Sequence, residues 1–352
     1  MSDQSLALQQ QVKANIEHGQ AMQITAGGSK TFYAQEIVGE ALSVKDHSGI
    51  ITYEPTELVV TARCGTRLQD LEATLAEQNQ MLAFEPPAYS KHATLGGCIA
   101  AGLSGPRRPF AGAVRDATLG TRIINAEAEI LKFGGEVMKN VAGYDVSRLM
   151  VGSLGTLGII LDTSLKVMPC PETEITVSYE LTERASLSRI NKICAQAYPV
   201  SATCFDGSQL YIRLSGTEAG VNKALSMLGG DTLEDAELFW KDIKNQQHSF
   251  FTSNKRIWRL SLRPGTPPLE IMGEQLIEWR GAQRWLASDQ DPEIIREIIG
   301  KHGGHATIFK NPEKNDLIFH PISGKLHELH MNLKLAMDPK SLFNPYRMYD
   351  GF

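Results

Sequence analysis

The feature that most constrains this chain is the uneven distribution of its glycines. Of 31 glycines, 12 fall between residues 93 and 160. A glycine inside a helix or strand costs roughly 0.5–1 kcal/mol relative to alanine, so such a cluster needs a compensating role. Two interpretations are open at this point. The region is either a turn-rich β domain, or backbone that approaches a large polar ligand with its amide N–H groups facing phosphate oxygens.

Length and composition indicate a globular protein of two domains. The chain has 352 residues, at about 100–200 residues per domain. A net charge of −5 gives no basic face for nucleic acid. Residues 1–5 lack the features of a signal peptide, and the uncharged run at residues 93–106 is too short and glycine-rich to span a bilayer. We therefore expect a cytoplasmic protein, peripheral on the inner face of the cell membrane only through partners.

Several common sites are excluded by inspection. Five cysteines are widely spaced without a C-x-x-C pair, which argues against a disulfide scaffold, a structural zinc site and an iron–sulfur cluster in this chain. No two glycines are separated by a single residue, so the G-x-G-x-x-G turn of a Rossmann domain is absent. The G-x-S-x-G and H-E-x-x-H motifs are absent as well.

Hydrophobic spacing predicts two regions of different character, divided near residue 172. Leu8, Val12 and Ile16 predict an opening helix, and Leu68, Leu71 and Leu75 form the inner face of a helix at residues 67–79. In the first region we also expect a strand at residues 21–25, a hairpin of residues 119–126 and 129–133, and a strand within residues 155–167. In the second we expect strands at residues 174–181, 202–205, 210–214 and 256–262, and helices at residues 184–197, 219–228, 234–244, 292–301 and 324–337.

Three segments, taken together, resemble one family. They are residues 49–61; residues 93–97 with 104–108 and 114–116; and residues 139–145 with 149–160. The combination resembles the FAD-binding domain of the p-cresol methylhydroxylase / vanillyl-alcohol oxidase superfamily, and within it the FAD-binding subunits of bacterial glycolate oxidases. The resemblance implies an α+β fold. Two α+β subdomains in residues 1–171 would hold FAD, and residues 172–352 would form a smaller α+β cap domain whose tail returns to the flavin.

The resemblance also implies which residues bind FAD. Residues 26–31 correspond to the pyrophosphate loop, where small residues let N–H groups converge and the hydroxyls of Ser29 and Thr31 add donors. Asn344 corresponds to an asparagine that approaches the flavin from the cap side. Arg115 either neutralises phosphate or flavin charge or pairs with Asp116. The complete set is Ala26, Gly27, Gly28, Ser29, Lys30, Thr31, Pro87, Thr94, Gly96, Gly97, Ala100, Gly102, Ser104, Arg115, Gly155, Gly158, Ile160 and Asn344.

Two features differ from the relatives. Many members of the superfamily attach FAD through a histidine in the first glycine loop, but residues 27–30 contain neither histidine nor cysteine, so we expect non-covalent FAD. The histidine-rich motif with which related D-2-hydroxyacid dehydrogenases hold a metal is also missing. His302 and His305 are three residues apart, yet no third ligand lies at a useful spacing, so we expect no metal site.

Oxidation of a 2-hydroxy acid needs a base, a cation for the carboxylate, a hydride acceptor and an electron acceptor. Lys139, Arg107 and Arg108 are candidates for the cation, and Tyr144 and His305 for orienting the substrate. Because the full set is not visible, the resemblance implies a complex with a larger FAD subunit and an iron–sulfur subunit. Glycolate, and with it D-lactate, would be oxidised to the 2-oxo acid mainly in the larger subunit, and electrons would pass to the iron–sulfur subunit.

Two other functions remain open. The first is a self-sufficient flavin oxidoreductase of the same fold, which acts on a bulkier alcohol or uses NADPH. Reduction of the bound flavin by NADPH would favour it. The second is a non-catalytic scaffold subunit whose FAD is vestigial or missing, and a colourless purified subunit would favour that interpretation.

Overall fold

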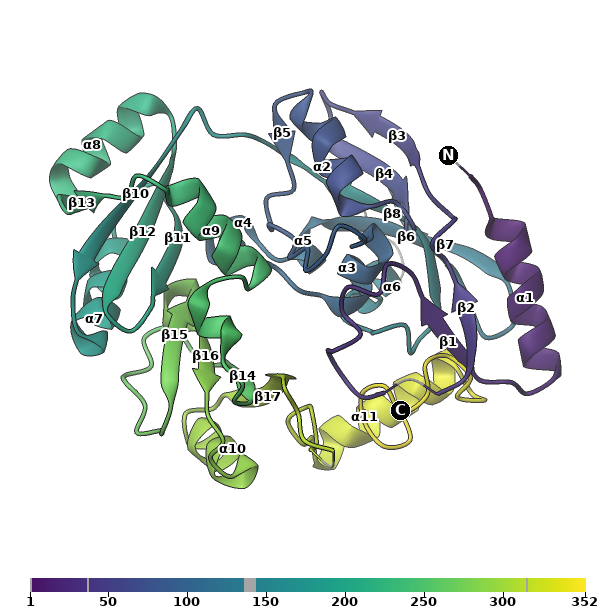
Figure 1. Cartoon of the computed structure of the whole chain (residues 1–352). Helices are drawn as coiled ribbons and strands as arrows, with labels where there is room; N and C mark the ends of the chain where they lie inside the picture. Colours follow the sequence, from purple (N-terminus) through teal and green to yellow (C-terminus); the bar gives the residue numbers. More distant parts are fainter. Residues whose placement is uncertain (1, 37, 136–143, 315) are drawn as a thin grey trace. The chain divides into compact units, whose positions relative to one another are not determined.

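The computed structural model describes residues 2–36, 38–135, 144–314 and 316–352, and these form two compact units (Figure 1). Unit 1 comprises Met1–Ser104, Gly112–Pro169 and Pro321–Phe352, and unit 2 comprises Gly105–Ala111 and Cys170–His320. The division at Pro169 lies beside the expected boundary near residue 172. The last segment differs from the expectation, because residues 321–352 belong to unit 1 and not to the cap domain.

Unit 1 is built on an antiparallel sheet of five strands in the order β3-β4-β8-β6-β7. Strand β8 lies at the centre and is buried along almost its whole length, whereas β6 and β7 form the expected hairpin. The leucines 68, 71 and 75 of helix α2 are fully buried, as their spacing predicts. The strands are β3 (Ile50–Glu54), β4 (Val59–Arg63), β6 (Thr118–Ile124), β7 (Ile130–Gly134) and β8 (Ile159–Lys166). The helices are α2 (Leu68–Ala76), α3 (Leu95–Ala101), α5 (Val114–Ala117) and α6 (Val146–Leu149).

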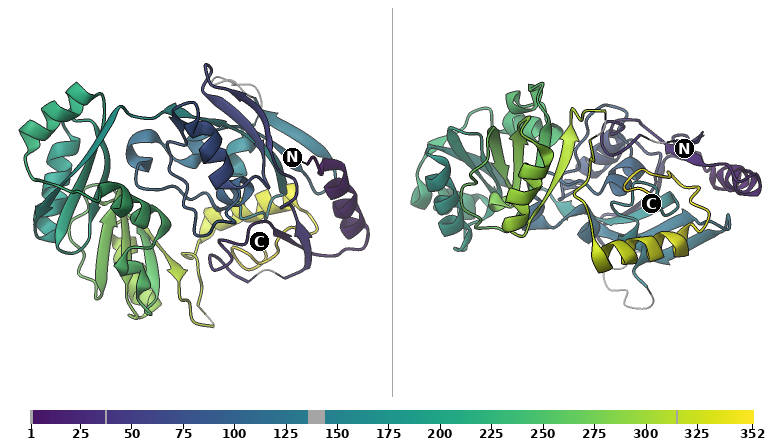
Figure 2. Two further views of the ribbon diagram at one scale, coloured as in Figure 1. Left: turned by 45° about the horizontal axis from the view of Figure 1, so that its top comes forward. Right: turned by 90° about the horizontal axis from the view of Figure 1, so that it is seen from below.

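Both ends of the chain join a second layer of unit 1. Strand β1 (Met22–Thr25) pairs in parallel with β2 (Glu40–Ser43), and Met22 forms a parallel bridge with Phe343 of the C-terminal tail. Helix α1 (Ser5–Glu17) packs against these strands through Leu8 and Val12. Figure 2 shows α11 (Gly324–Met337) and the tail beside the strands of unit 1. Short strands β5 (Gln80–Met81) and β9 (Met168–Pro169) pair with each other.

Unit 2 is an antiparallel sheet of eight strands in the order β13-β10-β12-β11-β15-β16-β14-β17. The expected strands and helices of this region are confirmed, but the strands β13, β15, β16 and β17 and the short helix α4 escaped prediction. The strands are β10 (Thr173–Glu180), β11 (Val200–Phe205), β12 (Gln209–Gly216), β13 (Asp231–Thr232), β14 (Ile257–Ser261), β15 (Glu274–Glu278), β16 (Gln283–Ala287) and β17 (His305–Lys310). The helices are α4 (Arg108–Ala111), α7 (Glu183–Cys194), α8 (Glu218–Leu228), α9 (Ala236–Asn245) and α10 (Pro292–Lys301).

The missed strands have a physical explanation. Strand β16 is buried at every position, yet it includes Gln283 and Arg284, which sequence patterns assign to the surface. The Arg284 guanidinium is satisfied by the carbonyl oxygens of Thr266 and Pro267.

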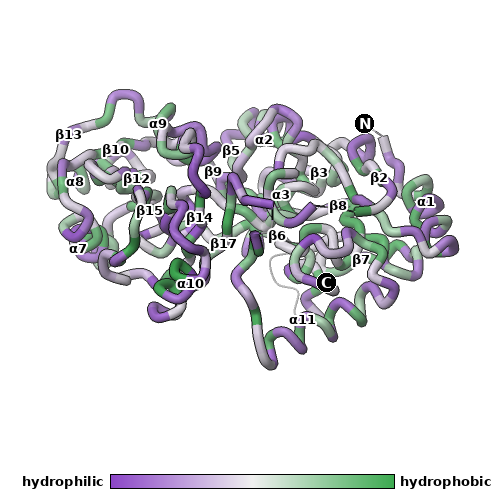
Figure 3. Tube along the Cα trace, turned by 60° about the horizontal axis from the view of Figure 1, so that its bottom comes forward, coloured by the Kyte–Doolittle hydropathy of each residue, from purple (hydrophilic) through white to green (hydrophobic). Residues whose placement is uncertain are grey.

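Hydrophilic and hydrophobic positions are mixed along α11 (Figure 3). Within the part of the chain that the structure describes, no helix combines the length and apolar character needed to cross a bilayer.

Candidate functional site

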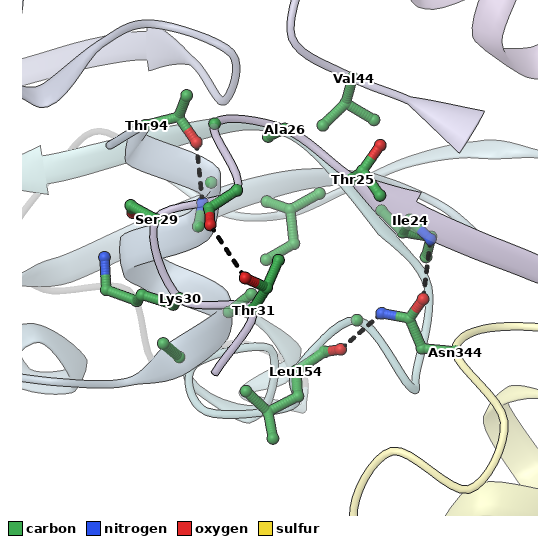
Figure 4. A pocket seen from close by; sticks show the side chains of 18 of the residues that line it. Ile24, Thr25, Ala26, Ser29, Lys30, Thr31, Val44, Thr94, Leu154 and Asn344 are labelled. Atoms are coloured by element: carbon green, nitrogen blue, oxygen red, sulfur yellow. Dashed lines mark hydrogen bonds between the residues drawn. The ribbon is translucent and has the colours of Figure 1, made fainter. Parts of the chain in front are cut away.

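The loop that follows β1 forms one wall of a pocket in unit 1 (Figure 4). A Cβ atom at position 27 would lie 1.5 Å from the carbonyl oxygen of His92, so only glycine lets the loop pass this close to the chain before α3. Gly28 has a φ of +65°, and a Cβ there would meet nothing within 4 Å. The first glycine is therefore required by packing and the second by backbone conformation.

Helix α3 forms a second wall made of small residues. Thr94 caps the helix, and the Gly97 N–H donates to its Oγ1 at 3.3 Å. A Cβ at position 96 would lie 2.7 Å from the Cβ of Cys64, so Gly96 allows α3 to pack onto the sheet. A Cβ at position 97 would meet only the Thr94 hydroxyl, at 3.3 Å. Gly97 and Ala100 both line the pocket. The space that a larger side chain would fill at position 97 is left open.

Asn344 closes the pocket on the side of β1 and has a φ of +40°. Its Oδ1 accepts a hydrogen bond from the Ile24 N–H, and its Nδ2 donates to the Leu154 carbonyl, both at 2.7 Å (Figure 4). A Cβ at position 155 would lie 2.5 Å from this Nδ2, so Gly155 makes room for the amide. Asn344 thus joins two walls of the pocket. Asn344 itself belongs to unit 1, and its approach to the flavin from the cap side stays a prediction.

A buried ion pair holds the tail in place behind Asn344. The Lys334 ammonium contacts Asp338 Oδ2 at 2.8 Å and donates to the carbonyls of Thr156 and Phe343 at 2.7 and 3.2 Å. Asp338 also accepts the N–H groups of Leu342 and Phe343, at 3.1 and 2.9 Å. Burial lowers the pKa of Lys334, and Asp338 opposes that shift. Because Thr156 and Phe343 each adjoin a lining residue, this pair fixes the pocket wall.

The charged residues that line the pocket are both cations, Lys30 and Arg347, and no carboxylate is among the lining residues. The Arg347 guanidinium donates to the carbonyls of Tyr33 and Gln35, and burial lowers its pKa to about 10. The Lys30 Nζ has no hydrogen-bond partner in the described part of the chain, and burial lowers its pKa. The pocket encloses about 940 Å³ of empty space, part of it open to solvent. Its charge and small residues suit an anionic ligand.

Comparison with known proteins identifies the family. A model of the FAD binding domain matches residues 4–134. Glycolate oxidase subunit GlcE of Escherichia coli (strain K12) is 45% identical over 347 residues, which cover 99% of this chain and 98% of that relative. The chain belongs to the glycolate oxidase subunit GlcE family. The resemblance of the sequence motifs is therefore confirmed, and FAD is the cofactor.

This GlcE-family chain is also similar to another glycolate oxidase subunit in sequence and to a solved structure in fold. Glycolate oxidase subunit GlcD of Bacillus subtilis (strain 168) is 32% identical over 177 residues, which cover 49% of this chain and 37% of GlcD. A solved structure of alkyldihydroxyacetonephosphate synthase aligns with a TM-score of 0.69 at 16% identity, covering 97% of this chain and 75% of that one. That likeness concerns the fold, and together with the domain match it confirms the expected α+β architecture.

The residues of the pocket fit FAD. The buried ammonium of Lys30 lacks a partner that a diphosphate would supply, and no carboxylate on the lining would repel it. Most residues predicted from the sequence to bind FAD lie together here. The predicted residues that line the pocket are Ala26, Gly27, Gly28, Ser29, Lys30, Thr31, Thr94, Gly96, Gly97, Ala100, Gly155, Gly158, Ile160 and Asn344.

Four residues predicted to bind FAD do not line the pocket. Gly102 ends α3 with a φ of +64° and lies close to Gly152, so it serves the packing of two loops. The Ser104 hydroxyl accepts the Val114 N–H at 3.0 Å. Arg115 is exposed on α5, and Pro87 is buried outside the lining. For these four, a contact with FAD stays a prediction.

The predicted catalytic residues are not brought together. Lys139 lies outside the described residues. Tyr144 is 95% exposed and does not line the pocket. His305 begins β17 in unit 2, and burial, Arg259 and His320 lower its pKa. Their roles therefore stay predictions. Within the described ranges, no three His, Cys, Asp or Glu side chains are grouped so as to hold a metal ion.

Sequence reasoning missed several lining residues. Arg347 lies three positions after Asn344, but nothing in its neighbourhood reveals that it reaches back to Tyr33 and Gln35. The apolar ones are dispersed over elements that carry no ligand signal of their own: Ile24 and Val44 lie in or beside β1 and β2, whereas Ala101 ends α3 and Leu154 lies in the loop before β8. The missed lining residues are Gln23, Ile24, Thr25, Val44, Ala101, Leu154 and Arg347.

We expect acid to release the flavin from the purified holoprotein. The residues that line the pocket include neither a histidine, the side chain through which many members of the superfamily attach FAD, nor a cysteine or tyrosine. Precipitation with acid followed by an absorption spectrum checks this, with the yellow colour expected in the supernatant. Flavin that stays with the washed pellet would show a covalent bond and overturn the prediction.

Proposed function

We propose that this chain is the FAD-containing subunit of a multi-subunit glycolate oxidase that oxidises glycolate, and also D-lactate, to the 2-oxo acid. The observation that carries the proposal is the alignment with glycolate oxidase subunit GlcE, which spans 99% of this chain and 98% of that relative. A D-lactate dehydrogenase of Anaerostipes hadrus, 31% identical over 232 residues, supports the wider range of 2-hydroxy acids.

The partners in this proposal are a larger FAD subunit and an iron–sulfur subunit. The similarity to glycolate oxidase subunit GlcD supports the first, because this chain aligns with GlcE over 347 residues and also with GlcD, a differently named glycolate oxidase subunit, over 177 residues. The same 177 residues are 49% of this chain but 37% of GlcD, so GlcD is the longer chain. The iron–sulfur subunit follows from the resemblance of the sequence motifs alone. We place the complex in the cytoplasm, peripheral on the inner face of the cell membrane.

The residues that line the pocket indicate which steps of the reaction this chain performs. Bound FAD supplies the hydride acceptor for oxidation of a 2-hydroxy acid. The chain's own residues bind and orient that cofactor: the loop at residues 26–31 wraps one side, and Asn344 joins β1 to the loop at Leu154. The lining offers neither a histidine nor a carboxylate to take the substrate's hydroxyl proton. We therefore assign substrate oxidation mainly to the larger partner, with this chain holding a second FAD.

The proposal is tested by comparing the chain alone with the complex. We expect negligible glycolate-dependent dye reduction by the isolated chain and sustained turnover by the complex co-expressed with both partners. The purified complex should contain one flavin for this chain beyond that of the larger subunit, together with iron. Robust turnover by the isolated chain would contradict dependence on a partner. A colourless chain in an active complex would favour the scaffold interpretation.

A further inference from the structure

Directly after the pocket loop (residues 26–31), the chain makes a strained turn at Ala34. This alanine has a φ of +78°, in the left-handed region that residues other than glycine seldom adopt. Ala34 is 8% and Tyr33 is 7% exposed, so the turn is packed within the protein. Backbone strain of this kind persists only where neighbouring contacts impose it, and it is concentrated at ligand clamps and switch segments. The contacts that impose it here therefore indicate a function for the turn.

Arg347 contacts the chain on both sides of Ala34. Its guanidinium donates to the Gln35 carbonyl through Nη1 and to the Tyr33 carbonyl through Nη2, the latter at 2.5 Å. The Arg347 carbonyl in turn accepts the Gln35 N–H at 3.2 Å. The rigid fork of a guanidinium suits two acceptors at a fixed separation, which the single ammonium of a lysine does not match. One residue of the C-terminal tail therefore holds the strained turn.

The tail that carries Arg347 is anchored on either side of it. The Phe343 N–H donates to Asp338 Oδ2 at 2.9 Å. At the other end Phe352 is 3% exposed in the core of unit 1, and its carbonyl accepts the Tyr346 N–H at 2.9 Å. The described residues 26–36, by contrast, contain neither helix nor strand. The tail is thus the fixed element, and the segment around Ala34 is the one that Arg347 can hold or release.

The same tail also holds the chain before the pocket loop. The Met22 N–H donates to the Leu342 carbonyl and the Ile24 N–H to Asn344 Oδ1, both at 2.7 Å (Figure 4). The two flanks of the pocket loop are therefore tied to the tail, upstream through β1 and downstream through Arg347. Loss of the Arg347 contacts would free the downstream flank alone, and the loop would stay attached at β1.

We propose that Arg347 is a positioning residue that latches the pocket loop over bound FAD, so that its contacts with Tyr33 and Gln35 set the rate of FAD exchange. The inference rests on FAD as the cofactor and not on glycolate oxidation. A latch must open before FAD enters as well as before FAD leaves. Its removal therefore raises both the association and the dissociation rate, whereas loss of an ordinary ligand contact raises mainly the dissociation rate.

The unit 2 residue Arg296 provides a matched control. Its guanidinium also donates to two carbonyls that are two residues apart, those of Leu317 and Phe319. The residue between them, Ile318, has no positive φ, and Arg296 does not line the pocket. Arg296→Met therefore removes a guanidinium held by two backbone carbonyls without touching the pocket loop.

The test measures FAD exchange on the full chain. Association is followed in stopped flow by mixing FAD with the flavin-free protein. Dissociation is followed by loading the protein with isotopically labelled FAD and chasing with an excess of ordinary FAD. Arg347→Met should raise both rates by about tenfold or more, as expected for the loss of hydrogen bonds from a charged donor. Arg347→Lys should resemble Arg347→Met, because the ammonium lacks the fork, and Arg296→Met should keep both wild-type rates.

Three results would overturn the proposal. An association rate in Arg347→Met equal to that of the wild type would show that only a ligand contact had been lost. Wild-type rates in Arg347→Lys would show that the charge matters and the fork does not. Equal changes in Arg296→Met and Arg347→Met would reduce the effect to general stability. If Arg347→Met does not fold, Arg347→Gln takes its place under the same criteria. A wild type that binds no FAD would instead contradict the cofactor assignment.

Discussion

Replacing Lys334 by methionine is expected to lower the free energy of unfolding by about 3–5 kcal/mol, because it leaves the Asp338 carboxylate buried and uncompensated. Lys334 is 0% and Asp338 1% exposed, and the ammonium makes three contacts that tie α11 to Thr156 and Phe343. Loss of the Lys334 contacts with Thr156 and Phe343 also loosens the adjoining pocket wall, to which Gly155 and Asn344 belong. The variant should therefore retain less FAD during purification. Urea denaturation measures the first effect and flavin absorbance the second.

The chain provides a matched control in a second ion pair of the same spacing. Lys301 contacts Glu297 at 2.7 Å, also at i and i+4, but both side chains are 68% exposed. Lys301→Met should leave the free energy of unfolding almost unchanged, because an exposed ion pair is scarcely more stable than its two charges separately hydrated. The double variant Lys334→Met with Asp338→Asn should recover part of the loss, since it removes the orphaned charge. Equal losses for Lys334→Met and Lys301→Met would contradict the structural role of the buried pair.

Much of this site could be predicted from the sequence, although the physical reason for its glycines differs from position to position. The dense glycines suggested backbone lying against a ligand. At positions 27, 96 and 155, however, a Cβ would collide with protein atoms before it met any ligand. Gly97 fits the interpretation of backbone lying against a ligand more clearly, because the space that a side chain at this position would fill belongs to the pocket. The sequence motifs identify the right loops, but they do not distinguish glycines required by packing within the protein from glycines that leave room for the ligand.

The parts that escaped prediction depend on contacts between distant segments. Asn344 joins Ile24 and Leu154, which are 320 and 190 residues away in the chain, and its amide is occupied by the protein itself. Lys334 would normally be placed on the surface, since an unpaired buried lysine is rare. Order along the chain places the α11 segment with the cap domain, whereas its buried lysine ties it to unit 1. No local pattern encodes these pairings.

Filling the space beside Gly97 is expected to weaken FAD binding strongly while the protein stays folded. Gly97 is the third residue of α3 and Gly220 the third residue of α8, and each donates its N–H to the capping threonine at 3.3 Å. A Cβ would meet only that threonine hydroxyl, at 3.3 Å in α3 and 3.1 Å in α8. The two positions are therefore closely matched in conformation and crowding. They differ in that Gly97 lines the pocket, whereas Gly220 belongs to unit 2.

The decisive measurement is a titration of FAD into the flavin-free wild type and the variants Gly97→Leu and Gly220→Leu, with circular dichroism to confirm that each is folded. The account predicts that Gly97→Leu weakens FAD binding by roughly a hundredfold or more, because the leucine occupies the space of the cofactor. Gly220→Leu should bind as the wild type does. A folded Gly97→Leu protein that binds FAD with wild-type affinity would show that the cofactor lies elsewhere.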